Sequence, residues 1–333
     1  MTRIPQEWSP CVSVVIPTFR RLDLLQRCLS AVLAQRLPGR GFEVVVADDG
    51  HDDDTRDFVE ALARDLPASI RLRYLRVHDG RGPATARNLG WRAARAELIA
   101  FTDDDTVPAA DWLREGEQAM REHSDWAGAC GRVEVPVAGA PTDHARMTQG
   151  LASAEFVTAN AFVRRAALEA IDGFDERFKL AWREDSDLQF RLAAQVGPVG
   201  RIPLAVVRHP VRHASWGISL RQQRNAFFDA LLYKKHPRLY RERIRRVPPW
   251  NYYVVVAATL LALAGALAGR PWLVALSTST AAALVLAFAW QRLRHTSRAP
   301  RHVGEMLATS ALIPFLSVYW RLRGAIHFRT LFW

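Results

Sequence analysis

Four short runs rich in apolar and β-branched residues recur in the first third of the chain, and turn-forming or polar residues follow each one. The runs cover residues 12–17, 42–47, 70–77 and 98–102. Such runs are typical of strands buried in a sheet. Between the first two, apolar residues recur at helical spacing, at positions 22, 25, 29, 32 and 33. We therefore expect alternating strands and helices, an α/β fold with a mostly parallel central sheet.

Two apolar segments without any formal charge lie near the end of the chain, at residues 251–269 and 271–290. Each is close to the ~20 residues that a helix needs to span a bilayer. Two such runs back to back favour a pair of transmembrane helices over buried core helices. Residues 306–320 form a shorter apolar run that contains Pro314, which predicts an interfacial or re-entrant helix.

The net charge of +11 is confined to the last part of the chain. Residues 1–237 contain 32 Lys and Arg against 32 Asp and Glu, whereas residues 238–333 contain 13 against two. This distribution favours a membrane-anchored tail with basic flanks over a nucleic-acid-binding domain, so we expect no nucleic-acid partner.

The positions of these arginines predict the orientation of the anchor. Five arginines precede the first apolar segment, between Arg238 and Arg246, and four follow the second, at positions 292, 294, 298 and 301. The positive-inside rule places both flanks in the cytoplasm. The first ten residues lack the apolar core of a signal peptide, and three scattered cysteines suggest a reducing compartment. We expect a multi-pass protein of the inner, cytoplasmic membrane with its N-terminal domain in the cytoplasm.

Three consecutive carboxylates, Asp103, Asp104 and Asp105, follow the fourth predicted strand. Ligands bind at the carboxyl edge of open α/β sheets. Adjacent acids repel one another and need a cation, a basic partner or water. Hard oxygen ligands beside a phosphate suit Mg²⁺ or Mn²⁺. Taken alone, the motif also fits a solvated acidic turn.

A glycine-rich loop precedes these acids, at residues 80–90. It is not a dinucleotide fingerprint, because Thr85 occupies the third glycine position. We interpret it as a loop that leads into a helix carrying Arg87 and Asn88. Such a helix start suits a phosphate or the neighbouring acids, and a turn with a surface arginine is an equal alternative.

These motifs occur in the order found in family-2 inverting glycosyltransferases. The shared features are Pro17-Thr18 after one strand, Asp48-Asp49-Gly50 after the next, the Gly-Pro loop with Ala-Arg-Asn, Phe-Thr-Asp-Asp-Asp, and the segments 173–178 and 184–191. The chain resembles this family over roughly residues 11–215. The resemblance implies the GT-A fold, a nucleotide-binding α/β sandwich.

The resemblance also implies roles for individual residues. Residues matched to the donor side are Pro17, Thr18, Asp49, Arg87, Asp103 and Asp104. Residues matched to a Mg²⁺ or Mn²⁺ site are Asp103, Asp105 and His209. The position of the catalytic base falls to Asp185, and the acceptor-side residues are Glu184, Asp187 and Trp182. Helix capping is the structural alternative for Asp185 and Asp187.

Two positions depart from the family's pattern. His51 stands where the family often has Ser or Thr, which affects the contacts to the base of the nucleotide. The Gln-x-x-Arg-Trp motif of processive enzymes is absent, and Arg221-Gln-Gln-Arg-Asn225 occupies a comparable place. This argues against a polymerising synthase and for transfer of a single sugar.

The sequence thus predicts four regions: a GT-A catalytic domain at 1–237, a basic juxtamembrane linker at 238–250, two transmembrane helices at 251–290, and a basic, amphipathic or re-entrant segment at 291–333. The expected activity is metal-dependent, inverting transfer of one sugar from a nucleotide-sugar donor. The expected acceptor is a hydroxyl of a lipid-linked or cell-envelope glycan at the cytoplasmic face, with membrane lipid as a further partner. Alternatives are a polyprenyl-phosphate glycosyltransferase, which would need no base, and a non-catalytic membrane scaffold.

Overall fold

The structure, a computed structural model, describes residues 8–37 and 39–332. It divides into two compact units. The first comprises the described residues up to Pro136 together with Gln149–Pro210. The second comprises Val137–Thr148 together with the chain from Val211 onwards.

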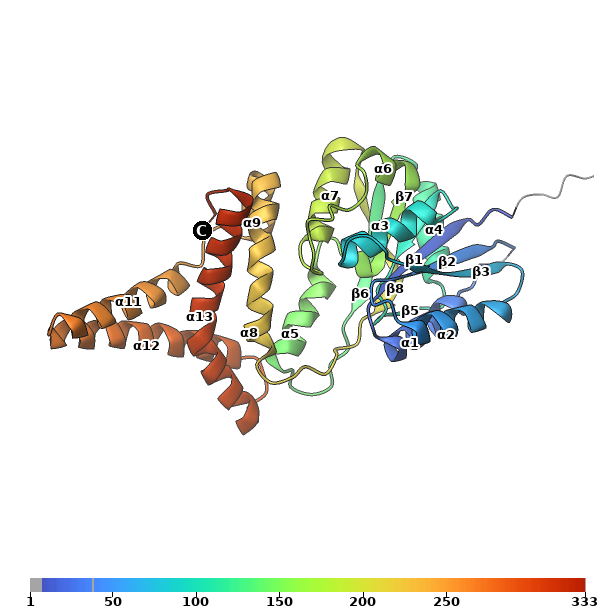
Figure 1. Ribbon diagram of the computed structural model, residues 1–333. Coiled ribbons are helices and arrows are strands. Elements are labelled where there is room, and N and C mark those ends of the chain that lie inside the picture. The colour runs from blue at the N-terminus through green and yellow to red at the C-terminus, as the bar shows by residue number, and fades with distance from the viewer. Residues whose placement is uncertain (1–7, 38, 333) are drawn as a thin grey trace, which may run out of the picture. The chain divides into compact units, whose positions relative to one another are not determined.

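Among the described residues, the first unit contains an eight-stranded sheet with the order β3-β2-β1-β4-β7-β6-β8-β5 (Figure 1). The strands are β1 (Val12–Thr18), β2 (Phe42–Asp48), β3 (Ile70–Arg76), β4 (Leu98–Phe101), β5 (Val107–Pro108), β6 (Gly128–Glu134), β7 (Ala161–Arg164) and β8 (Val199–Arg208). The first four are parallel to one another, whereas β7 is antiparallel to both of its neighbours. The α/β fold and the four predicted strands are confirmed, and the sheet is mixed.

Helices cover both faces of this sheet. They are α1 (Leu22–Leu33), α2 (Asp53–Arg64), α3 (Pro83–Ala93), α4 (Trp112–Glu122), α6 (Arg165–Ala170) and α7 (Glu184–Gln195). Val14 and Ile16 of β1 pack with α1 on one face, whereas Val15 packs with Trp91 of α3 on the other. Helices α1 and α2 thus lie on the face opposite α3 and α7 (Figure 1). All seven residues of β1 are buried because side chains alternate between two covered faces.

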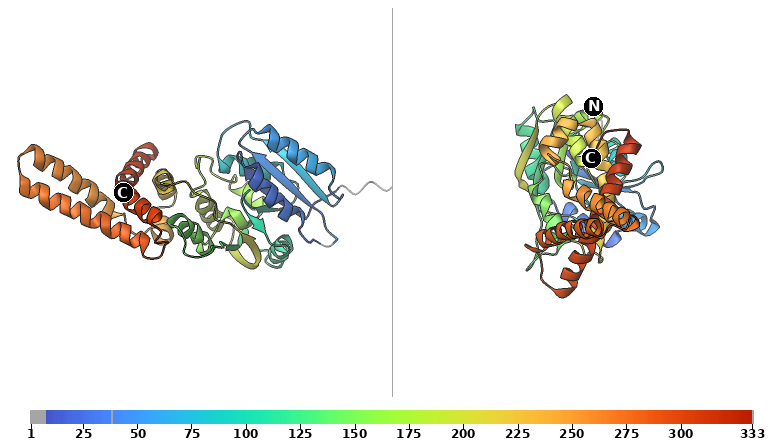
Figure 2. Two further views of the ribbon diagram at one scale, coloured as in Figure 1. Left: turned by 90° about the horizontal axis from the view of Figure 1, so that it is seen from below. Right: turned by 90° about the vertical axis from the view of Figure 1, so that its left-hand side faces the viewer.

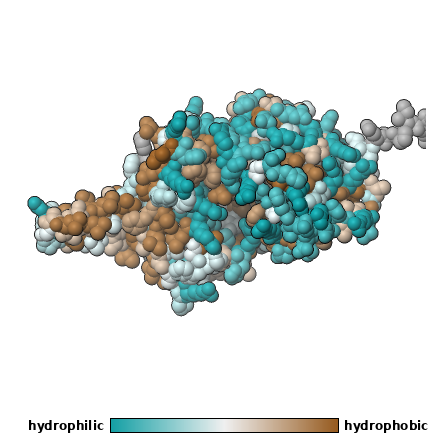
Figure 3. Space-filling model, in the orientation of Figure 1, coloured by the Kyte–Doolittle hydropathy of each residue, from teal (hydrophilic) through white to brown (hydrophobic). Residues whose placement is uncertain are grey.

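The second unit is helical. Its elements are α5 (Asp143–Gln149, which ends in the first unit), α8 (Ile218–Gln222), α9 (Ala226–Lys235), α10 (Pro237–Leu239), a π-helix (Tyr240–Ile244), α11 (Trp250–Leu267), α12 (Pro271–Leu293) and α13 (Pro300–Phe328). Helices α11 and α12 form a hairpin that turns at Gly269 (Figure 2). The face of this hairpin that Figure 3 shows is mostly apolar.

Three helices of the described chain, α11, α12 and α13, are long and apolar enough to cross a membrane by length and composition. The first two coincide with the predicted pair. The third is a single 29-residue helix that includes Pro314 and extends well beyond residues 306–320. The expected interfacial or re-entrant placement of that segment stays a prediction.

The predicted catalytic domain extends to residue 237, whereas the structure groups residues 211–237 with the second unit. The reason is the packing of α9 on α13. At Gly324 of α13 the two backbones are so close that a Cβ would lie 2.6 Å from the carbonyl oxygen of Phe227. Such close approach requires glycine.

Candidate active site

Asp104, the middle residue of the acidic motif, points toward the end of β1. Its carboxylate accepts a hydrogen bond from Thr18 Oγ1 at 2.9 Å and one from Arg21 Nη1 at 3.3 Å. Burial raises the pKa of Asp104 to about 6, while Arg21 opposes that rise. Through these two hydrogen bonds, the Asp104 carboxylate connects the acidic loop to the end of β1.

Asp103 binds a buried arginine. Arg87 Nη2 donates to Asp103 Oδ1 at 2.8 Å, and Thr106 Oγ1 donates to the Asp103 carbonyl oxygen at 2.8 Å. Burial would raise the pKa of Asp103, but the Arg87 guanidinium outweighs it and holds the pKa below its usual range. Asp103 is thus kept ionised and fixed in place.

The same arginine reaches a second carboxylate. Arg87 Nη1 donates to Glu184 Oε1 at 3.0 Å, and both side chains are almost completely buried. Burial raises the pKa of Glu184 to about 7, although Arg87 opposes that rise. Within the described chain, Glu184 Oε2 has no hydrogen-bond partner. Arg87 thus joins the acidic loop to the start of α7, and its place near the donor stays a prediction.

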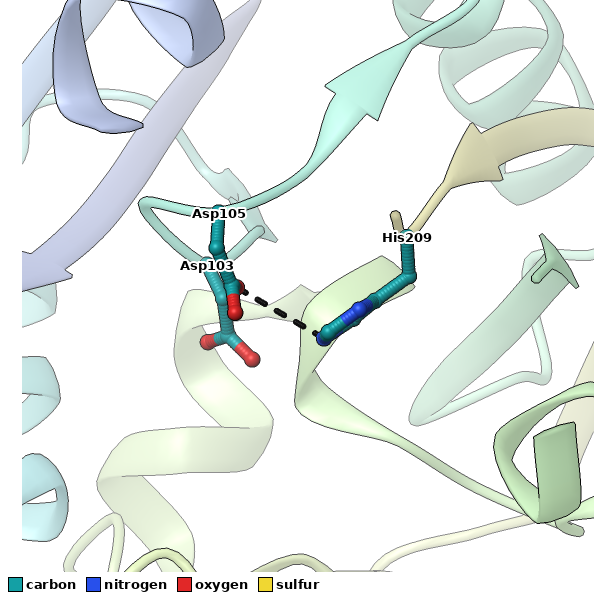
Figure 4. Close-up of side chains that lie close together, drawn as sticks. All are labelled: Asp103, Asp105 and His209. Atoms are coloured by element: carbon teal, nitrogen blue, oxygen red, sulfur yellow. Dashed lines mark ion pairs between the residues drawn. The ribbon is translucent and has the colours of Figure 1, made fainter. Parts of the chain in front are cut away.

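Asp103, Asp105 and His209 converge on one point (Figure 4). One ligand atom from each lies within 4.8 Å of the other two, and His209 Nε2 lies 3.5 Å from Asp105 Oδ1. His209 follows β8, and its backbone N–H donates to the Glu134 carbonyl oxygen at 2.8 Å. Two carboxylate oxygens and one imidazole nitrogen form a donor set that fits a divalent cation. The structure therefore brings together the three residues matched to a metal site.

The residues matched to the nucleotide lie at the carboxyl ends of β1 and β2. Pro17 and Thr18 are buried, and Asp49 is partly exposed. Asp49 Oδ2 accepts a hydrogen bond from the backbone N–H of Gly82 at 2.8 Å. Asp49 Oδ1 is buried and has no partner among the residues that the structure describes.

Gly82 holds the glycine-rich loop in a form that other residues cannot adopt. Its φ is 99°, and an added Cβ would lie 2.7 Å from the carbonyl oxygen of Lys179. Both observations require glycine. The loop thus passes close to residue 179 and contacts Asp49 before α3 begins.

The first turn of α7 carries the residues matched to the acceptor side. Asp185 is partly exposed, and its Oδ1 accepts hydrogen bonds from the Ser186 backbone N–H at 2.6 Å and from Ser186 Oγ at 3.3 Å. Burial raises the pKa of Asp185. Trp182 is partly buried, with the Arg183 guanidinium 4.5 Å from its ring centre.

Asp187 has a different environment. Its side chain is completely buried, and its carboxylate accepts a 2.8 Å bond from Arg191 Nε, one turn along α7. In this structure its carboxylate faces the interior and serves the packing of α7. Glu184 is likewise enclosed, with Arg87.

Two polar side chains that support the site received no role in the sequence analysis. Arg21 binds Asp104, and Asn88 donates from Nδ2 to Glu176 Oε1 at 2.9 Å and to the Phe174 carbonyl oxygen at 2.8 Å. Asn88 stood in the Ala-Arg-Asn motif, which was the available signal. No comparable signal marked Arg21.

Comparisons with known proteins indicate the family to which the first part of the chain is similar. Residues 13–171 match the profile described as Glycosyl transferase family 2. The glycosyltransferase AglE of Haloferax volcanii is 28% identical over 173 residues, which is 50% of this chain and 56% of AglE. Validoxylamine A glucosyltransferase of Streptomyces hygroscopicus subsp. jinggangensis is 29% identical over 252 residues, 65% of this chain and 56% of that protein. The matched part thus spans just over half the length of these relatives.

Among solved structures, the mannosyltransferase PcManGT from Pyrobaculum calidifontis, in complex with GDP-Man and Mn²⁺, is similar in fold. Its TM-score is 0.56 at 20% identity, over 95% of this chain and 88% of PcManGT. The profile match covers strands β1 to β7 and the acidic motif, and the similar fold extends beyond it. Residues 13–171 therefore match a glycosyl transferase family 2 domain, and the fold is of the GT-A type.

Proposed function

We propose that this protein is a membrane-anchored, metal-dependent glycosyltransferase. It transfers a single sugar, with inversion, from a nucleotide-sugar donor to a hydroxyl of a lipid-linked or cell-envelope glycan on the cytoplasmic face. The observation that carries the proposal is the convergence of Asp103, Asp105 and His209 at the carboxyl edge of the sheet. Ligands bind at this edge in open α/β folds.

The donor would bind beside Pro17, Thr18 and Asp49. A buried carboxylate oxygen without a partner is costly, and Asp49 Oδ1 is such an atom within the described chain. A hydroxyl or N–H group of the nucleoside would satisfy it. Two similar proteins support a nucleotide-sugar donor, since one is named as a glucosyltransferase and the other was solved with GDP-Man.

A divalent cation would be held by Asp103, Asp105 and His209. When bound, it would offset the negative charge that develops on the leaving nucleoside diphosphate. The imidazole nitrogen favours Mn²⁺ over Mg²⁺, which prefers all-oxygen sites. Arg87 orients Asp103 through the 2.8 Å ion pair and links it to the start of α7 through Glu184.

Asp185 is the proposed general base. Both of its hydrogen bonds from Ser186 go to Oδ1, so Oδ2 is available to a substrate proton. In the reaction, Oδ2 takes the proton of the acceptor hydroxyl while the hydroxyl oxygen forms a bond to the anomeric carbon. The bond from that carbon to the diphosphate oxygen breaks, and the nucleoside diphosphate leaves with both electrons. The raised pKa makes Asp185 a stronger base than an ordinary aspartate.

The membrane anchor would be α11 and α12. Each is apolar and long enough to span a bilayer. Arginines flank both outer ends, which favours a cytoplasmic location of the residues before and after the hairpin. An anchored enzyme of this kind works beside the membrane surface, where a lipid-linked acceptor would be presented.

The test compares two neighbouring carboxylates in the full-length protein, purified in detergent and assayed with sugar nucleotides and Mn²⁺. Asp185→Asn should lower turnover ~10²–10⁴-fold, because general-base catalysis typically contributes that much. Its donor affinity and melting temperature should stay close to wild type. Asp187→Asn is the matched control, and it should lower stability by several kcal/mol, at most about 3–5, because it removes the ion pair of the mostly buried Arg191.

Two outcomes would contradict the proposal. Wild-type turnover by Asp185→Asn on a polyprenyl-phosphate acceptor would favour transfer to phosphate, which is already ionised and needs no base. A protein that binds no sugar nucleotide in the presence of Mn²⁺, and neither transfers nor hydrolyses one, would be a scaffold.

A further inference from the structure

A helix in a water-soluble domain exposes its polar face, whereas helix α13 exposes an apolar face and buries several polar side chains. Its exposed apolar residues recur at intervals of three and four positions. They are Leu312, Phe315, Tyr319, Leu322 and Ile326, which we call the outer stripe. The opposite face buries the polar side chains of Thr309, Ser310, Ser317 and Arg321 beside the apolar Met306, Ile313 and Val318. An exposed apolar stripe of this spacing needs an apolar surface to cover it.

The buried polar face of α13 is bound to the end of α12. Arg292, in the last turn of α12, donates to Thr309 Oγ1 at 2.8 Å and to Ser310 Oγ at 2.9 Å. It also forms a 2.7 Å ion pair with Asp143. Arg292 and Asp143 are charged and belong at the boundary between lipid and water. The middle of α13 is therefore level with the end of the α12 span.

The second half of α13 is bound to polar residues of α9. Arg321 lies 3.9 Å from Asp229, and Lys234 Nζ donates to the Phe328 carbonyl oxygen at 2.7 Å. Gly324 packs directly on the backbone of α9. A ten-residue helix that contains Asp229 and ends in two lysines does not cross a bilayer. The C-terminal half of α13 is therefore also held at the water boundary.

The direction of α13 agrees with these contacts. In Figures 1 and 2, α13 runs crosswise over the base of the α11–α12 hairpin instead of alongside it. With 18 and 23 residues, the hairpin helices are ~27 and ~35 Å long, which suits a hydrocarbon core of ~30 Å. If the hairpin stands across the bilayer, α13 lies in the membrane plane.

We propose that α13 binds the surface of the lipid bilayer as an interfacial helix and is not a third span. Its outer stripe faces the acyl chains, and the exposed Arg323 and Arg329 reach the phosphate headgroups. We assign the lipid bilayer as the surface that covers the outer stripe, because the stripe belongs to the same unit as the apolar hairpin. The end of α13 then stays on the same side of the membrane as α9. This inference rests on the membrane anchoring in the proposed function.

The experiment measures the depth of three positions along the stripe. Leu312, Tyr319 and Ile326 are replaced by cysteine one at a time, in a Cys11→Ser background because Cys28 and Cys130 are buried. Each full-length variant is labelled with an environment-sensitive fluorophore and reconstituted into vesicles of anionic phospholipid. Quenching by lipids with nitroxides at the headgroup or deep in the acyl chain then gives the depth.

An interfacial helix predicts the same shallow depth at all three positions. A spanning helix predicts a difference of about 21 Å between positions 312 and 326, at 1.5 Å per residue. The matched controls are Val254, Leu260 and Leu267 on α11, which are also exposed and should show graded depths. Graded depths along α13 would overturn the inference and leave the anchor intact.

Two further results would also overturn it. If α11 is graded but no lipid quenches the α13 labels, protein covers the stripe. If α11 itself shows no gradient, the membrane anchoring of the proposed function fails, and the placement of α13 fails with it.

Discussion

Asp103, Asp104 and Asp105 are adjacent in the chain but occupy three different environments. Asp104 is bound by Thr18 and Arg21, Asp103 by Arg87, and Asp105 faces His209. The mutual repulsion of three acids is thus relieved by separate partners. Each residue can be tested by itself.

For the metal site, we predict that Asp105→Asn weakens Mn²⁺ binding by at least about 10-fold. Loss of a residue that only supports a metal ligand typically costs ~10–100-fold in affinity or activity, and a ligand should cost no less. Asp104→Asn is the control, and it should change the affinity far less. Titration with Mn²⁺, followed by the electron paramagnetic resonance signal of the free ion, measures both. Equal losses in the two variants would contradict the assignment.

The buried pair of Arg87 and Glu184 predicts a pH dependence of stability. The pKa of Glu184 is about 7 in the fold and ~4.3 in an unfolded chain. A carboxyl group with a raised pKa stabilises the fold fully below its unfolded pKa, and that contribution is lost as the pH rises through the folded pKa. The melting temperature of the wild type should therefore fall relative to that of Glu184→Gln as the pH rises from about 5 to about 8.

Melting curves in chelator at each pH unit would show this difference, and the chelator removes any contribution from bound metal. Parallel curves for wild type and Glu184→Gln would mean that Glu184 titrates as an exposed carboxylate does.

At the scale of elements, α13 holds the second unit together. It packs on α9, α11 and α12, and its contact with α9 depends on the absence of a side chain at Gly324. Gly304, in the first turns of the same helix, has no atom within 4 Å of its would-be Cβ. The two glycines form a natural comparison.

We predict that Gly324→Ala destabilises the second unit by about 1–3 kcal/mol, because the new methyl group meets the Phe227 carbonyl oxygen. Gly304→Ala should instead stabilise it by about 0.5–1 kcal/mol through helix propensity. Unfolding in mild detergent, followed by circular dichroism, measures both. A neutral Gly324→Ala would show that α9 and α13 are packed less closely.

At the scale of the whole molecule, the chain passes between its two units three times, near residues 136, 148 and 210. The first unit carries the proposed catalytic residues, and the second carries the apolar hairpin. The basic flanks of the hairpin predict the side on which the first unit lies.

We predict that proteinase K added outside intact cells leaves residues 1–240 uncut, because the proposed orientation places the catalytic unit in the cytoplasm. Cleavage should occur, if anywhere, at the exposed turn around Gly269. Permeabilised cells are the control, in which loops of the first unit become accessible. Fragments cut within residues 1–240 in intact cells would reverse the orientation.

The sequence by itself indicated the first four strands, the pair of apolar helices and the sheet edge at which the acidic motif lies. Buried strands require apolar runs, and parallel strands bring their carboxyl ends to one edge, so residues 17, 49 and 103 could be placed together. The two membrane-spanning helices could be predicted because a helix that crosses a bilayer needs a long segment without charged residues. The position of His209 in the metal cluster was predicted through family resemblance.

Only the tertiary structure showed which carboxylates are held by arginines or hydroxyl groups far away in the chain. Arg87 and Glu184 are 97 residues apart, and Thr18 and Asp104 are 86 apart. Such pairs leave no periodic trace in the chain, so the sequence did not show that Asp104 and Glu184 are bound by Thr18 and Arg87. The direction of α13 was likewise hidden, because composition records how apolar a helix is, whereas its contacts with Arg292 and α9 determine where it lies.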